Sequence, residues 1–311
     1  MRKADKHTKN KTKFKTNPFD SVLFEFAKRV SKKWDKDECK KLSTKVCPSG
    51  VTVIKDIPYI DDAKKSHMLD ILYKNDLDEA APIMIDIHGG GFISGSKESD
   101  NLFNHYFALA GFVVFSINYT LIVDEVDVFY NIAEVHSATK WVLENATKYH
   151  GDLSNIYFSG HSAGGVLAIV ELLLSKDKNL CSIYGFEMLD FSAKGLILDC
   201  GFMKFYDKIL PYAMFRNVVF PAGYEKDDRY KNIIFEKNPN IKLLPKTFLI
   251  TNDKDELRNM SIYFYKLLQK NNVESKLEKA KTGGHVGIIY EPETEENQKI
   301  FKSIFEFFDL K

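Results

Sequence analysis

The chain has 311 residues, of which 44% are hydrophobic and 28% are charged. This composition is ordinary for a globular protein with a sizeable buried core, and the length allows one large domain or two small ones. Because 44 Lys and Arg stand against 43 Asp and Glu, the net charge is +1, and no global charge draws the chain to nucleic acid or to an anionic membrane. A small neutral substrate fits this balance.

The charge is unevenly distributed, because residues 1–17 hold seven Lys or Arg and a single acid. We expect this segment to be a disordered, solvated tail; the alternative is an arm that binds polyanions. No apolar segment of the kind found in secretory signals follows it, and no run of about 18 apolar residues exists to span a membrane. The expected location is therefore the cytoplasm.

The four cysteines do not resemble a disulfide framework in a chain of this length, so we expect free thiols. None of them sits in a CxxC pair with the spacing of metal ligands, and no metal is expected. Cys200 ends an apolar run, and we interpret it as a small core residue rather than as a nucleophile.

The first predicted element is an amphipathic helix from Pro18 to Trp34, where apolar residues recur at helical spacing. It belongs to an N-terminal region, residues 18–50, that precedes the main domain, residues 51–311. In that domain short β-rich runs alternate with helical patterns. The predicted strands are 51–57, 68–73, 83–87, 112–119, 155–159, 195–199, 247–251 and 275–281, and the predicted helices are 131–148, 163–174, 256–270 and one around 300–308. This alternation favours an α/β fold with a mostly parallel sheet and helices on both faces.

Residues 202–244 interrupt this alternation, because the segment is longer than a simple connection between two strands and is rich in aromatic residues. We interpret it as an insertion that forms, with the N-terminal helix, a cap over the carboxyl end of the sheet. The alternative is that both segments only fill out the core or a subunit interface. The aromatic residues favour an apolar pocket for an acyl group.

The strongest motif is Gly160-His161-Ser162-Ala163-Gly164, which follows an apolar strand and opens a helix. In this context G-x-S-x-G predicts a nucleophile elbow, a sharp turn that leaves the serine Oγ exposed above the sheet. Gly160 and Gly164 are expected to be glycine because the turn crowds the backbone. The alternative is a loop that carries the pattern by chance.

A second motif, His88-Gly89-Gly90-Gly91-Phe92, comes directly after the predicted strand 83–87. Consecutive glycines permit close approach of a ligand to the backbone, and such a loop supplies N–H donors to the oxyanion of acyl transfer. Taken alone, the run also fits a flexible glycine turn. The serine elbow further along the chain favours the catalytic interpretation.

Through these two motifs, and over residues 51–311, the sequence resembles the carboxylesterases of the hormone-sensitive-lipase type, which have the α/β-hydrolase fold. The resemblance implies that the backbone N–H groups of Gly90, Gly91 and Ala163 form an oxyanion hole, with His88 and Gly89 as support. It also implies a catalytic triad in the chain order serine, acid, histidine.

The resemblance assigns the base to His285, which stands in a glycine-rich loop after the last predicted strand, and the acid to Asp255, whose D-E-L-R run is similar to the family's D-P-L-R. Asp253, two positions earlier, is expected to be a loop residue. The family often has Asp or Glu directly before the serine, where this chain has His161. We do not expect His161 to be the base, because the elbow directs its side chain away from the Oγ of Ser162.

These residues predict a serine hydrolase that cleaves carboxylic esters of short to medium acyl chains through an acyl-enzyme intermediate, without a metal or an organic cofactor. Amidase, formamidase and carbohydrate-ester (feruloyl or acetyl) esterase activities are alternatives with the same triad. A rival of another class is a non-catalytic ligand-binding protein, as in the plant gibberellin receptor, which resembles this family but lacks the histidine. The expected partner is the small ester, and the chain is expected to be a monomer or a homodimer.

Overall fold

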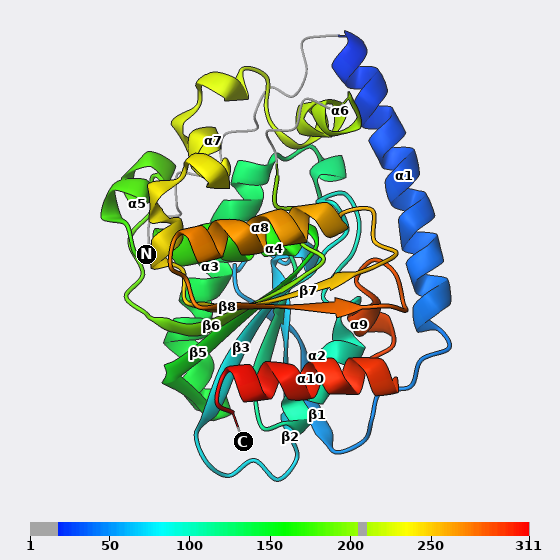
Figure 1. Cartoon of the computed structure of the whole chain (residues 1–311), viewed down its shortest axis with the longest axis vertical. Coiled ribbons are helices and arrows are strands. Elements are labelled where there is room, and N and C mark those ends of the chain that lie inside the picture. Colours follow the sequence, from blue (N-terminus) through cyan, green and yellow to red (C-terminus); the bar gives the residue numbers. More distant parts are fainter. Residues whose placement is uncertain (1–17, 205–209, 311) are drawn as a thin grey trace.

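The computed structural model describes residues 18–204 and 210–310, so the predicted basic tail, residues 1–17, lies outside the described residues. One eight-stranded sheet forms the centre of the molecule, with the strand order β1-β2-β4-β3-β5-β6-β7-β8 (Figure 1). The strands are β1 (Val51–Pro58), β2 (Met68–Lys74), β3 (Ala81–Ile87), β4 (Val113–Ile117), β5 (Gly151–His161), β6 (Ala193–Asp199), β7 (Lys246–Asn252) and β8 (Ser275–Ala280). Each of them overlaps a strand predicted from the sequence.

Strand β2 pairs antiparallel with β1 and with β4, and every other pairing in the sheet is parallel. The helices are α1 (Pro18–Leu42), α2 (Asn101–Leu109), α3 (Val128–Asn145), α4 (Ala163–Leu174), α5 (Lys178–Tyr184), α6 (Leu210–Val219), α7 (Asp228–Ile233), α8 (Arg258–Lys270), α9 (Gly287–Tyr290) and α10 (Glu295–Phe307). Helices α3, α4 and α8 pack on one face, and α2 and α10 pack on the other (Figure 1). The predicted mostly parallel sheet with helices on both faces is confirmed.

The central strands are apolar on both sides because successive residues point to opposite faces of the sheet. In β3, Ile83, Ile85 and Ile87 belong to the core layer beneath α3 and α4, whereas Met84 belongs to the layer beneath α2 and α10. All four side chains are fully buried. Since full burial of such a side chain contributes about 1.5–3 kcal/mol, strand β3 is anchored from both faces.

Helix α1 extends to Leu42, past its predicted end at Trp34, through a lysine-rich stretch that contains neither Gly nor Pro. It runs along one side of the molecule and packs against α6, which belongs to the 202–244 insertion (Figure 1). No helix within residues 18–204 and 210–310 is long and apolar enough to cross a membrane.

Candidate active site

Ser162 occupies a sharp turn between β5 and α4, with a positive φ of 49°. The turn is crowded: a Cβ atom on Gly160 would lie 2.6 Å from the Cα of Gly165, and one on Gly164 would lie 2.1 Å from the carbonyl oxygen of Ile87. A side chain at either position would therefore displace the turn. The serine itself is largely buried, with its Oγ held at the start of the helix.

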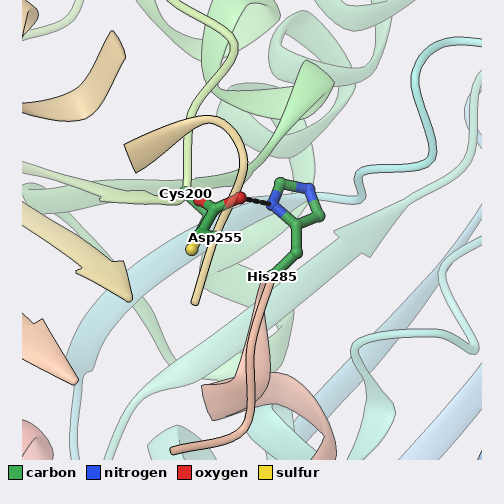
Figure 2. A group of neighbouring side chains, drawn as sticks. All are labelled: Cys200, Asp255 and His285. Carbon is green, nitrogen blue, oxygen red and sulfur yellow. Dashed lines mark hydrogen bonds and ion pairs between the residues drawn. The ribbon is translucent and has the colours of Figure 1, made fainter. Parts of the chain in front are cut away.

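The structure brings the three predicted triad side chains together. His285 Nε2 lies 2.9 Å from Ser162 Oγ, and His285 Nδ1 lies 2.9 Å from Asp255 Oδ1. Figure 2 shows the contact between His285 and Asp255. When Nδ1 carries the proton, the ring donates to Asp255 and its Nε2 accepts from the serine hydroxyl. The serine follows β5, the aspartate follows β7 and the histidine precedes α9, so the sheet order creates this arrangement.

Asp255 differs sharply from Asp253, the nearby acid. The Asp255 side chain is 1% exposed, and Oδ1 also accepts the backbone N–H of Leu257 at 2.9 Å. Burial opposes its ionisation, but the hydrogen bond and the charge of His285, together with the Leu257 N–H, lower the pKa of this carboxyl below its ordinary value. The Asp253 side chain is 46% exposed and faces Arg258 at 3.4 Å, away from the imidazole pair.

The glycine loop after β3 passes beside the serine. Gly90 has a φ of +93°, and a Cβ there would lie 1.8 Å from the carbonyl oxygen of Ser94, so only glycine fits the turn. Within the described residues the N–H groups of Gly90 and Gly91 donate no hydrogen bond. Ala163 is the first residue of α4, where a helix leaves N–H groups unpaired. Three potential donors to an oxyanion therefore border the serine.

Tyr119, which the sequence analysis did not single out, supports this loop. Its hydroxyl donates to the carbonyl oxygens of His88 at 3.0 Å and of Gly89 at 3.1 Å, and its ring stacks on the His88 imidazole. His88 Nδ1 in turn donates to the Gly89 carbonyl. Burial lowers the pKa of His88 to about 4, so this ring is neutral at pH 7. The only sequence signal for Tyr119 is its place at the end of a predicted strand.

His161 takes no part in the triad geometry. Its Nε2 lies 3.2 Å from Asp86 and its Nδ1 lies 3.2 Å from Asp199, in a cluster with no exposed side chain. Burial opposes its charge, but Asp100 and these two carboxylates raise its pKa well above the ordinary value. His161 therefore belongs to a buried cluster of ionisable groups and not to the contacts around Ser162. Asp86 lies one residue before the end of a predicted strand and Asp199 ends another, and parallel strands bring such ends together.

A cavity of about 650 Å³ opens over Ser162 and His285. Trp34 of α1 and two residues of the insertion, Phe202 and Phe215, form its aromatic side. Trp34 reaches the glycine loop, because a Cβ on Gly91 would lie 3.1 Å from its ring. The lining also includes Glu38, Ser99 and Tyr290, with the tyrosine hydroxyl donating to the glutamate at 3.0 Å. Both predicted cap segments therefore contribute to the wall of the cavity.

Cys200 directly follows β6 and lies beside Asp255. Its Sγ, a carboxylate oxygen of Asp255 and a ring nitrogen of His285 all lie within 4.8 Å of one another. The thiol helps to lower the pKa of Asp255. It does not meet Oδ2 of Asp255 in hydrogen-bond geometry, so Oδ2 has no hydrogen-bond partner among the described residues. All four cysteines are free, as expected.

The fold and this serine–histidine–aspartate arrangement define a hydrolase of the α/β class. A family model described as "alpha/beta hydrolase fold" matches residues 84–289, more than half of the chain. The chain belongs to this family, and the predicted relation to its hormone-sensitive-lipase type is confirmed.

Two curated relatives differ in how much of the chain they match. Esterase LipI of Mycobacterium tuberculosis is 33% identical over 98 residues, which cover 31% of this chain and 30% of that protein. The 2-hydroxyisoflavanone dehydratase of Glycyrrhiza echinata is 25% identical over 285 residues, which cover 83% of this chain and 85% of that protein. The second match extends over most of the chain.

Solved structures share the whole architecture at low sequence identity. Esterase B from Lactobacillus rhamnosis has a TM-score of 0.85 at 20% identity, with 94% of this chain and 96% of that chain covered. A bacterial heroin esterase has a TM-score of 0.71 at 18% identity, with 94% and 96% covered. These similarities show that the α/β-hydrolase fold includes parts of the chain before and after the residues that the family model matches.

Proposed function

We propose that this protein hydrolyses carboxylic esters, with Ser162 as the nucleophile, His285 as the general base and Asp255 as the acid that orients it. The observation that carries the proposal is the pair of 2.9 Å contacts from the two nitrogens of His285 to Ser162 and to Asp255. A serine beside an oriented imidazole is the arrangement that activates a hydroxyl for acyl transfer.

In the proposed reaction, His285 takes the proton of Ser162 as Oγ attacks the ester carbonyl, and then gives it to the departing alcohol. Water repeats the sequence on the acyl-enzyme. The unpaired N–H groups of Gly90, Gly91 and Ala163 would stabilise the tetrahedral oxyanion, where one donor is typically worth about 3–4 kcal/mol. The chain supplies every group that these steps need, so the proposal includes no metal and no organic cofactor.

The substrate side of the proposal rests on the cavity. Its volume of about 650 Å³ and its aromatic side suit short to medium acyl chains. A tributyrin phosphonate is the inhibitor in a structure of the similar Esterase B, which supports esters of that size. We further propose that α1 and the 202–244 insertion act as the cap that selects the substrate, because both contribute side chains to the cavity. The free cysteines support a reducing compartment such as the cytoplasm.

Amides, formamides and feruloyl or acetyl esters of carbohydrates remain alternative substrates, because the same triad serves every acyl transfer. A second candidate reaction is a dehydration, favoured by the alignment with the dehydratase over 83% of the chain. In that case His285 would abstract a proton from carbon, and Ser162 would not become acylated.

The test is hydrolysis of a panel of p-nitrophenyl esters, combined with labelling by a fluorophosphonate probe and peptide mass spectrometry. The wild type should turn over the short esters and carry the label on Ser162. Ser162→Ala should abolish both signals, while the control Ser154→Ala, at an exposed serine of β5, should behave as the wild type. Labelling of a different serine, or equal activity in Ser162→Ala, contradicts the proposal. Dehydration without labelling would favour the second candidate.

A further inference from the structure

Cys200 adds a third potential metal ligand to the imidazole–carboxylate pair of the active site. In Figure 2 the Asp255 carboxylate is directed at the His285 ring, and the Cys200 sulfur lies beside the same aspartate. The ligand atoms of the three side chains are all within 4.8 Å of one another. We propose that this cluster is a zinc-binding site and that zinc bound there stops hydrolysis; the second part rests on the proposed function.

The donor set matches the chemistry of zinc. Thiolate, imidazole and carboxylate are the ligands that Zn²⁺ takes in proteins, and a tetrahedral ion with bonds of about 2.0–2.3 Å holds its ligand atoms about 3.3–3.8 Å apart. In the structure these atoms lie within 4.8 Å of one another, so the side chains must move closer together to bind the ion. Three protein ligands leave the fourth position for water.

One acceptor atom at the site, Oδ2 of Asp255, has no hydrogen bond that metal binding would break. The Oδ2 atom of Asp255 is buried and forms no hydrogen bond among the described residues, which is a costly condition for a carboxylate oxygen. A bound cation would satisfy it. The Asp255 side chain is 1% exposed, so this oxygen is held in place rather than free to turn toward solvent.

The three ligands come from separate parts of the fold and are held by the backbone. Cys200 directly follows β6, has a positive φ of 50°, and donates its N–H to the carbonyl oxygen of Ile250 at 2.9 Å. The thiol is buried, but Asp255 and His285 line the catalytic cavity, and the His285 side chain is 39% exposed. The Asp255 and His285 side of the cluster therefore borders the catalytic cavity, and a metal ion would enter from that side.

Zinc binding and catalysis exclude each other through the protons of His285. In the resting enzyme Nδ1 carries the ring proton and donates it to Asp255, while Nε2 accepts from Ser162. To bind zinc through Nδ1, the ring proton moves to Nε2, and the Cys200 thiol loses its proton to solvent. Bonds from sulfur, oxygen and nitrogen to zinc replace the hydrogen bond, with no change of oxidation state. The protonated Nε2 then cannot accept the serine proton.

The Cys200 cluster differs from another group of potential metal ligands in the same protein. The described part of the chain holds a second group of potential ligands, formed by Asp86, Asp100 and His161. Both ring nitrogens of His161 are already paired with carboxylates, no thiol is present, and all three side chains are buried. That group is a closed ion-paired cluster, whereas the Cys200 cluster faces a cavity.

The experiment uses the metal alone as the probe. The purified full chain is freed of metal, titrated with Zn²⁺ by calorimetry, and titrated with Co²⁺, whose thiolate charge-transfer absorption reports a cobalt–sulfur bond. The wild type should bind one equivalent and show the thiolate band. Cys200→Ser should lose the band and weaken zinc binding by at least about tenfold, since even indirect partners of a metal are worth that much. Cys181→Ser, at another buried free cysteine, should change neither signal.

Inhibition is then measured as the activity of each variant with zinc divided by its own activity without zinc, so a change in basal activity does not matter. Zinc should inhibit the wild type and Cys181→Ser, reversibly on addition of a chelator, and should inhibit Cys200→Ser at least about tenfold less strongly. If Cys200→Ser does not fold by circular dichroism, zinc binding to Asp255→Asn is measured by calorimetry instead of inhibition, and it should be at least about tenfold weaker than in the wild type.

The outcomes separate the two proposals. No thiolate band in the wild type, or an equal band in Cys200→Ser, overturns the metal site even if the enzyme hydrolyses esters. A band that depends on Cys200 in a protein without esterase activity supports the metal site and counts against the proposed function. Ser162→Ala should still bind zinc, because the serine is not a ligand.

Discussion

Replacement of Asp255 by asparagine tests the third member of the proposed triad against its close neighbour. Asp255 is buried and accepts a hydrogen bond from Nδ1 of His285 at 2.9 Å, whereas Asp253 is 46% exposed and faces Arg258. An amide at position 255 can present its NH₂ group to Nδ1 and favour the wrong tautomer of the ring. In serine proteases the same exchange lowers kcat by about 10⁴, which corresponds to about 5.5 kcal/mol in the activation free energy.

The matched control is Asp253→Asn, which removes a solvated charge and should lower kcat less than about tenfold, or about 1.4 kcal/mol. Both variants are compared with the wild type on p-nitrophenyl butyrate, after circular dichroism has shown equal folding. The KM of Asp255→Asn should change little, because the aspartate does not touch the ester. A larger loss of kcat in Asp253→Asn, or equal losses in both variants, would refute the assignment of the acid.

Three further predictions follow from the loop, the buried histidine and the cap. Tyr119→Phe removes the hydroxyl that holds the carbonyls of His88 and Gly89, so kcat should fall about tenfold with KM nearly unchanged; a loss of stability alone would contradict this role. The pKa of His88 is lowered to about 4 in the folded protein, whereas in the unfolded chain it is about 6.5. As the pH falls below about 6.5, His88 is therefore protonated in the unfolded chain but not yet in the folded protein, and the free energy of unfolding decreases. Urea unfolding should therefore show that, from pH 7 to pH 5, the free energy of unfolding of the wild type decreases by about 2 kcal/mol more than that of His88→Asn. Equal decreases in the two proteins would show that the His88 ring is not buried in its neutral form. Because Trp34 lines the cavity, Trp34→Ala should shift the acyl-chain length that the enzyme prefers in a panel of esters. An unchanged preference would contradict the proposal that α1 belongs to the cap.

The sequence by itself determined the fold class and the local chemistry. The strands of the sheet were predictable because most of them are short apolar runs, although β8 is more polar. One glycine motif follows β3 at once and the other begins at the end of β5, and backbone crowding there requires glycine. Ser162 and the loop at His88 could be singled out for the same reason. His285 and Asp255 were predicted mainly from the resemblance, together with their places in loops after predicted strands. The order of residues along the chain does not show that the ends of β7 and β8 meet at the serine.

Only the tertiary structure decided which side chains meet across strands that are distant in the sequence. The order β4-β3-β5-β6-β7 places the carboxyl ends of these strands in one row, so Asp86, His161 and Asp199 pair and Tyr119 reaches the glycine loop. The same row sets Cys200 beside Asp255, which turns a residue expected to be simple core into a neighbour of the triad. Spacing along the chain carries no information on such contacts, because the crossover helices separate residues that the hydrogen-bonded sheet holds side by side.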